Sequence, residues 1–204
     1  MIPQKKTDGS DKPTGYKIVK FVGEHGTLSE TTVYYVNPEK EVDFTNTVKV
    51  FTKTPDFAYT EVGGTWSSEE FNKKFTDDAT FTFTFKKLDN VIPKTKNDES
   101  EKPKGYVKVT LIPTDKATDS KKIIYFVNPK ENVSIKSKPT GKTETINDIE
   151  YTYVFKGWTV TRGTIASWDS ETIAGKFIQE TEITAKYTVQ VDQKELKPAP
   201  IAKK

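Results

Sequence analysis

Short stretches in which apolar and polar residues alternate are the dominant pattern of this chain. Residues 81–85 alternate phenylalanine with threonine, and residues 182–187 repeat that alternation with other side chains. A period of two places successive side chains on opposite faces of a β-strand, so both segments predict strands with one face toward a core. Four further segments are also predicted strands: residues 16–21, 33–36, 106–111 and 123–127. We therefore expect a mainly β protein.

Most of these segments occur twice in the same order, which indicates an internal duplication. Ser-Asp-Lys-Pro-Thr-Gly-Tyr at residues 10–16 returns as Ser-Glu-Lys-Pro-Lys-Gly-Tyr at 100–106, an offset of 90. The block around Tyr34 returns around Tyr125 at an offset of 91, with Asn-Pro after the predicted strand in both copies. A third block, which holds Trp66, returns at an offset of 102. Copy two therefore carries eleven extra residues between its second and third blocks.

The duplication sets the domain organisation that we expect. Repeat domain 1 is expected at residues 16–88 and repeat domain 2 at 106–190, with linkers at 1–15 and 89–105 and a C-terminal linker or tail at 191–204. Both linkers are polar and contain two prolines, which limit backbone freedom. They are therefore expected to act as semi-stiff tethers.

Each copy is also predicted to contain one short helix. Ser67 followed by Glu70 is typical of a capping box, and Asp169 takes the matching N-cap position in copy two. The apolar positions of this block have spacings that fit one side of a helix: Trp66, Phe71 and Phe75, matched by Trp168, Ile173 and Phe177.

The extra residues of copy two fall around two segments. Residues 138–142 contain proline and glycine and predict a turn, whereas residues 151–158 are apolar and aromatic and predict a strand. Together they predict that copy two has a longer hairpin than copy one, with an edge that projects further.

Composition and charge exclude several functional classes. The net charge of +3 comes from 32 basic and 29 acidic residues mixed along the chain, and Arg162 is the only arginine, so no nucleic-acid footprint is present. The absence of cysteine excludes disulfides and thiolate chemistry. No apolar run reaches the length of a membrane helix, so no membrane span is expected in this chain. We expect a monomer.

Catalytic and metal-binding patterns are also missing. His25, the only histidine, lies in a predicted surface turn, which favours a solvated side chain over a catalytic base. The acidic pairs Asp77-Asp78 and Asp98-Glu99 lack the spacing of a calcium loop, and no glycine-rich phosphate loop is present. Lysine, asparagine and acidic residues are too abundant to single out a Lys–Asn isopeptide cross-link. We expect no enzyme activity, no metal and no cofactor.

Copy two carries a family resemblance. Residues 153–158 (Tyr-Val-Phe-Lys-Gly-Trp), then Trp168-Asp169 and residues 181–187, resemble the Listeria-Bacteroides type repeat of internalin-like and other bacterial surface proteins. The Lys-Pro-x-Gly-Tyr and Tyr-x-Val-Asn-Pro blocks are similar to tandem repeats of cell-wall-anchored proteins from streptococci and related cocci. The resemblance implies small α+β, β-grasp-like domains on extracellular stalks and adhesins of Gram-positive cells. Copy one has Phe57-Ala58-Tyr59 in place of the Gly-Trp element.

Two functional hypotheses follow. In the first, the repeats form a non-catalytic stalk that projects a functional domain from the cell wall, and their partners are neighbouring repeats of the same chain. In the second, they are an adhesin module that binds a host protein or glycan through aromatic residues or an exposed strand edge. Trp158, unique to copy two, and Tyr153 are the candidate ligand-binding residues. The repeated pair Trp66 and Trp168 is expected in the cores.

Overall fold

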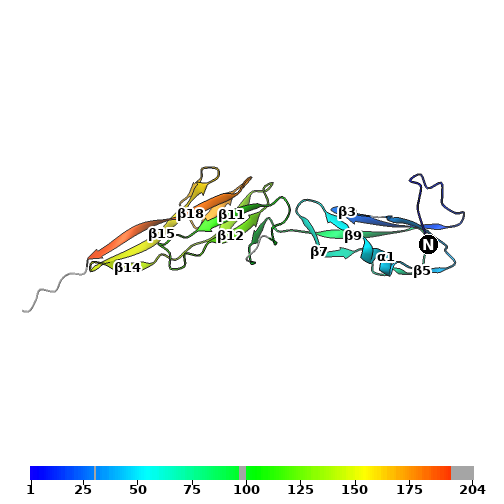
Figure 1. Ribbon diagram of the computed structural model, residues 1–204, viewed down its shortest axis with the longest axis horizontal. Helices are drawn as coiled ribbons and strands as arrows, with labels where there is room; N and C mark the ends of the chain where they lie inside the picture. Colours follow the sequence, from blue (N-terminus) through cyan, green and yellow to red (C-terminus); the bar gives the residue numbers. More distant parts are fainter. Residues whose placement is uncertain (30, 97–99, 194–204) are drawn as a thin grey trace, which may run out of the picture. The chain divides into compact units, whose positions relative to one another are not determined.

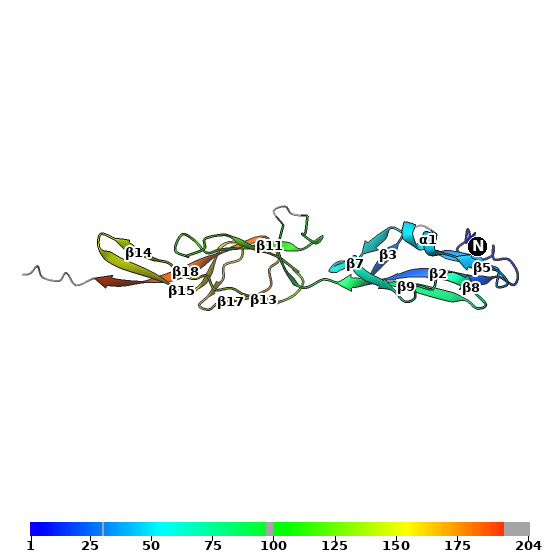
Figure 2. The same ribbon diagram turned by 90° about the horizontal axis from the view of Figure 1, so that it is seen from below.

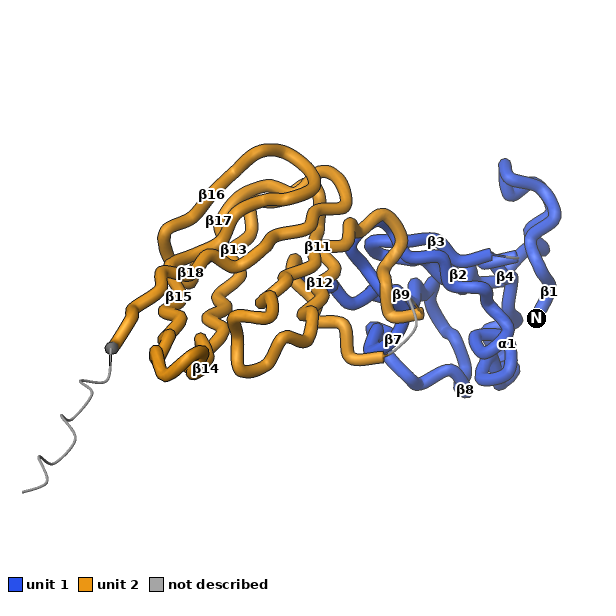
Figure 3. The backbone as a smooth tube through the Cα atoms, turned by 60° about the vertical axis from the view of Figure 1, so that its left-hand side comes forward, with its two compact units in different colours: residues 1–89 blue, residues 90–204 orange. Residues whose placement is uncertain are grey.

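The computed structural model describes residues 1–29, 31–96 and 100–193 (Figure 1). The fold is mainly β: strands account for 53% of the chain and helices for 3%. Contacts divide the chain into two compact units, residues 1–89 (unit 1) and residues 90–204 (unit 2), coloured separately in Figure 3. Within the described ranges no helix has the length and apolarity of a membrane span.

Unit 1 is built on a five-stranded sheet with the order β1-β4-β2-β9-β7. Its strands are β1 (Ile2–Pro3), β4 (Val33–Val36), β2 (Lys17–Glu24), β9 (Ala79–Lys87) and β7 (Tyr59–Trp66). Two small ladders complete it, β3 (Gly26–Leu28) with β6 (Lys53–Pro55) and β5 (Glu41–Asp43) with β8 (Asn72–Lys74), together with the helix α1 (Thr45–Val50).

Unit 2 repeats this order in a seven-stranded sheet, β10-β12-β11-β18-β15-β14, with β16 also paired to β15. Its strands are β10 (Val91–Pro93), β12 (Ile123–Val127), β11 (Val107–Ile112), β18 (Thr181–Gln193), β15 (Ile149–Arg162), β14 (Thr143–Ile146) and β16 (Ser167–Trp168). The separate ladder is β13 (Val133–Lys136) with β17 (Thr172–Gly175). Figure 2 shows the paired strands β14, β15 and β18 side by side.

The two units match at the level of single residue pairs. In the central parallel ladder of unit 1, Val19 lies opposite Ala79; in unit 2 the equivalent pair is Val109 and Thr181. These positions differ by the offsets of 90 and 102 that the sequence blocks show. The small ladder behaves in the same way, with Val42 opposite Lys73 in unit 1 and Val133 opposite Gly175 in unit 2. The two copies thus share the same register of strand pairing, in agreement with the matching order of their apolar positions.

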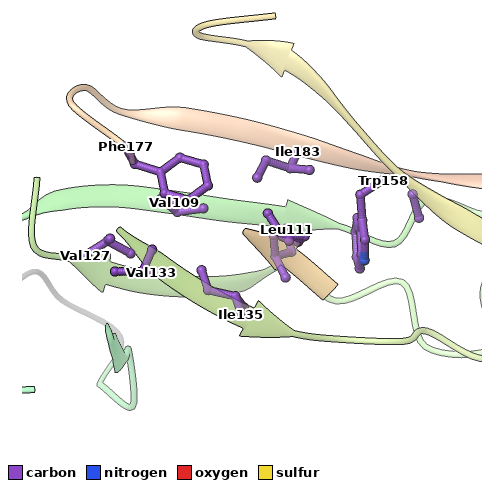
Figure 4. Close-up of a cluster of buried hydrophobic side chains, with 10 residues drawn as sticks. Val109, Leu111, Val127, Val133, Ile135, Trp158, Phe177 and Ile183 are labelled. Carbon is purple, nitrogen blue, oxygen red and sulfur yellow. The ribbon is translucent and has the colours of Figure 1, made fainter. Parts of the chain in front are cut away.

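Each unit has its own aromatic or aliphatic core. In unit 1 the alternation of β9 buries Phe81, Phe83 and Phe85, and Phe21 stacks on Phe81 with a centroid distance of 5.3 Å. In unit 2 the buried cluster of Figure 4 joins residues from six strands and one loop: Val109, Leu111, Val127, Val133, Ile135, Trp158, Ile173, Phe177, Ile183 and Ala185. Separate cores allow each unit to hold its own fold.

The predicted helices at residues 66–75 and 168–177 are wrong, because these segments form β8 and β17 instead. Phe71 and Phe75 are both buried, as are Ile173 and Phe177. A spacing of four residues fits one face of a helix and, being even, one face of a strand equally well. The helix of unit 1 is α1, and the described part of unit 2 contains none.

The predicted linkers are also corrected, because each contributes an edge strand. Within 1–15, β1 pairs with β4, and within 89–105, β10 pairs with β12. The passage from β9 to β10 takes three residues: the Leu88 amide donates to the Ala58 carbonyl at 2.9 Å, and the Asn90 carbonyl accepts from the Asn128 amide at 2.9 Å. Residues 194–204 of the predicted tail lie outside the described residues.

The longer hairpin of copy two is present, with its turn in a different place. The strand predicted at 151–158 lies within β15. Its tight turn to β14 uses Asn147 and Asp148, both with positive φ (50° and 62°), rather than residues 138–142. Asparagine and aspartate tolerate this left-handed conformation, which two-residue hairpin turns require.

Candidate functional site

Trp158 lies in the core of unit 2 rather than on its surface. Its side chain has 0% exposure, its Nε1 donates to the Ser137 carbonyl at 3.0 Å, and its ring contacts Phe155 edge-on at 5.4 Å. Figure 4 shows the indole among aliphatic side chains of the cluster. A fully buried ring offers no face to a glycan or protein, so the expectation that Trp158 binds a ligand is corrected.

Tyr153, on β15, lies in a cluster of polar side chains. Its hydroxyl donates to Glu144 Oε1 at 2.7 Å and accepts from Lys116 Nζ at 3.2 Å, while the Lys116 ammonium lies 4.5 Å from the ring centroid. Lys142 Nζ approaches Glu144 Oε2 at 2.8 Å. The ring face and the hydroxyl of this candidate residue are therefore both engaged within the unit, and the cluster holds the loop that carries Lys116 against β15.

The charged groups of this cluster shift one another's pKa values. Hydrogen bonds from Lys142 and then Tyr153 lower the pKa of Glu144 from its ordinary value of 4.5. The hydrogen bond to Tyr153 raises the pKa of Lys116 from 10.5. Both shifts favour the charged forms, as expected for a structural network that satisfies its own members.

His25 and the acidic pair of unit 1 also have structural partners. His25 takes a left-handed backbone (φ 65°) between β2 and β3, and its ring stacks on Tyr59 at 4.3 Å. Asp78 accepts the Ile18 amide at 2.7 Å. The other pair, Asp98-Glu99, lies outside the described residues. Among the residues that the structure describes, no group of three or more His, Asp or Glu side chains is placed to hold a metal ion.

A pocket of about 130 Å³ lies in unit 2. Its apolar lining comes from the end of β15, from the loop between β15 and β16, from β16 and β17 and from the loop before β18: Val160, Ala166, Trp168, Ala174, Phe177 and Ile178. Trp168 is half-buried and donates from Nε1 to the Ala174 carbonyl at 3.1 Å. The expected core role of Trp168 is thus only partial, because the same ring packs against the core and lines the pocket.

Sequence reasoning missed this pocket. Ile178, in its lining, is 68% exposed, and Ile165, which lies in the chain between the lining residues Thr164 and Ala166, is 95% exposed. One signal was present: copy one has Thr76 where copy two has Ile178.

Comparison of the chain with family models, curated proteins and solved structures finds no match. The candidate site therefore stands on the geometry of this chain alone.

Proposed function

We propose that this chain is a non-catalytic tandem repeat module of a bacterial surface protein, and that it acts as a spacer that projects a functional domain from the cell wall. Its repeats are proposed to be small β-grasp-like domains that act outside the cell, with neighbouring repeats of the same chain as partners. The observation that carries the proposal is the residue-for-residue match of the two central ladders, Val19 with Ala79 and Val109 with Thr181. Duplication of one unit is an economical way to add length.

The strand order suits a part that bears load. In unit 1 the early strand β2 and the final strand β9 are parallel neighbours, joined over Val19–Glu24. In unit 2, β11 and β18 are parallel neighbours over Val109–Ile112. Tension on the two ends of a parallel pair shears all ladder hydrogen bonds together instead of opening them one at a time. Each unit therefore resists a pull along the chain.

The short passage between the units supports the same role. Leu88 is hydrogen-bonded within unit 1 and Asn90 within unit 2, so no long free segment separates the repeats. A spacer keeps its ends further apart when the linkers between its repeats are short.

Small-angle scattering of the chain in solution tests the spacer proposal. A compact repeat of this size has a radius of gyration of about 13 Å, so two repeats in line give roughly 22 Å or more. A value of about 17 Å, the expectation for one globule of this length, would contradict the proposal.

A second candidate function is adhesion to a partner on the host. Burial of Trp158 removes the aromatic residue first expected to carry it. The apolar pocket of unit 2, with Ile165 and Ile178 beside it, is the observation that favours adhesion. Binding is measurable separately from reach, because the pocket lies within one unit.

A further inference from the structure

The pocket of unit 2 is built by residues that unit 1 lacks. In unit 1, Trp66 lies directly opposite Phe83 on the central sheet. In unit 2, Trp158 takes the corresponding place opposite Ala185, and Trp168 is moved one strand outward, where it pairs with Trp158. Trp158 and Ile173 are 15 residues apart, whereas the equivalent Trp66 and Phe71 are 5 apart, so the extra residues lie around the hairpin that joins β15 to β16 and not at 138–142 and 151–158 as predicted. This hairpin supplies one wall of the pocket, including Ala166.

The rim of this pocket exposes more apolar surface than folding requires. Ile165 is 95% exposed and Ile178 is 68% exposed, while the equivalent of Ile178 in copy one is the polar Thr76. Exposed isoleucines beside an apolar concavity are typical of a surface that is covered by a partner.

The size of the pocket limits what enters it. An apolar protein cavity of about 150 Å³ accepts benzene. A pocket of about 130 Å³ therefore fits one branched aliphatic or phenyl-sized group and excludes an indole or a sugar ring with its hydroxyls. The polar residues of its lining are Thr164, Lys176, Gln179 and Thr181.

A polar notch adjoins the pocket through Thr181, which lines both. The charged residues of the notch are balanced: Lys108 and Arg162 against Glu180 and Glu182. Balanced charge gives no net attraction to an anion or a cation and suits the neutral, dipolar amides of a peptide backbone. An apolar pocket beside such a notch matches one side chain and its flanking peptide groups.

We propose that this pocket is a binding site for a leucine, isoleucine or phenylalanine side chain presented on the backbone of a partner protein. The inference rests on the adhesive candidate function and is independent of the spacer role. Ile178 covers the bound side chain, and Trp168 packs against it.

Amide NMR of the isotope-labelled full chain tests the proposal with two small probes. N-acetyl-leucine methylamide is titrated into the millimolar range, and N-acetyl-glycine methylamide, which has the same backbone and no side chain, is the matched probe. The expected result is saturable shifts for residues 160–181, including the Trp168 indole N–H, with the leucine probe only. Equal shifts with both probes, or shifts spread over both units, overturn the proposal. Saturation of the same signals by a methyl glycoside instead points to a glycan and also overturns it.

Variants locate the site. Ala166→Leu fills the pocket from its wall and is expected to weaken leucine-probe binding at least tenfold, while the buried Trp158 indole signal confirms the fold. Ile178→Ser changes an exposed side chain, so the unit should still fold, and it is expected to weaken leucine-probe binding about fivefold. Val62→Ser is the matched control, because Val62 is 77% exposed in unit 1 and lies far from the pocket in sequence. Unchanged binding in Ile178→Ser overturns the proposal. The radius of gyration is the same in all variants, so failure here leaves the spacer test intact.

Discussion

A Cβ atom on Gly157 would lie 2.0 Å from the carbonyl oxygen of Trp168. The close approach arises because β15 bulges between Phe155 and Gly157 while β16 returns along it. The Gly-Trp element of copy two therefore has a role in packing. Gly157 has no side chain, so the backbone of Trp168 can approach it, and the Trp158 side chain is buried in the core.

The first prediction concerns this contact. Gly157→Ala is expected to destabilise unit 2 by about 3 kcal/mol, because backbone atoms cannot yield as a flexible side chain does. Gly175→Ala is the control: Gly175 has φ +157°, against +156° at Gly157, but no atom within 4 Å of its added Cβ. Urea unfolding measures both variants. Equal losses would show that backbone conformation, and not the contact with Trp168, is responsible.

The second prediction separates the two tryptophans of unit 2. Trp158→Phe removes a hydrogen bond to Ser137 and part of a fully buried ring, so a loss of about 2–3 kcal/mol is expected. Trp168→Phe, at a half-buried ring, is expected to cost about 1 kcal/mol or less. Denaturant titration followed by fluorescence compares the two. A larger loss for Trp168 would place it, and not Trp158, at the centre of the core.

The third prediction tests whether the units unfold independently. Phe21 and Leu111 occupy equivalent buried positions in the two copies. Phe21→Ala and Leu111→Ala are each expected to cost about 3–5 kcal/mol. Scanning calorimetry should show that each variant lowers the transition of its own unit and leaves the other unmoved. One transition that shifts as a whole in both variants would mean that the units fold as one body.

The fourth prediction concerns pH. The pKa of Glu144 is lowered from 4.5 in the folded state, chiefly by Lys142. Its contribution to stability is therefore present above about pH 4.5 and is lost as the pH falls through the lower folded pKa. Glu144→Gln should be less stable than the wild type at pH 7, and the difference should shrink as the pH falls below 4.5. Stability curves that stay parallel down to pH 2 would contradict a charged role for Glu144.

Much of the strand pattern was predictable from the sequence. Residues 33–36 and 123–127 coincide with β4 and β12, because branched and aromatic runs end at Asn-Pro in both copies. The Asn side chain then accepts the amide two residues on, at Glu39 and at Lys130, which ends each strand in the same turn. Local chemistry determines these boundaries, so a local pattern reveals them.

The helix was not predictable, because its stability does not come from its own residues. The segment Thr45–Val50 is rich in β-branched side chains, which disfavour helices. Burial of Val48 and of the flanking Phe44 and Phe51 stabilises it instead. These contacts are made with strands distant in sequence, and no window of the chain contains them.

The candidate site was misjudged for a related reason. Trp158 was predicted to bind a ligand because copy one has no counterpart at that position in the sequence alignment. In the sheet, however, Trp158 lies opposite Ala185 just as Trp66 lies opposite Phe83 in unit 1, so Trp66 is its structural counterpart. This equivalence is set by pairing with a strand distant in sequence, so the alignment of sequence blocks, which matched Trp66 to Trp168, did not reveal it.

Single-molecule force spectroscopy measures directly whether the chain is a spacer made of two autonomous load-bearing repeats. With handles at the two ends of the chain, we expect two separate unfolding peaks, each releasing roughly 300 Å of contour length at ~3.6 Å per residue. Both peaks should be well resolved, because β2 with β9 and β11 with β18 are loaded in shear. A single peak that releases the whole chain, or extension without resolved peaks, would contradict it.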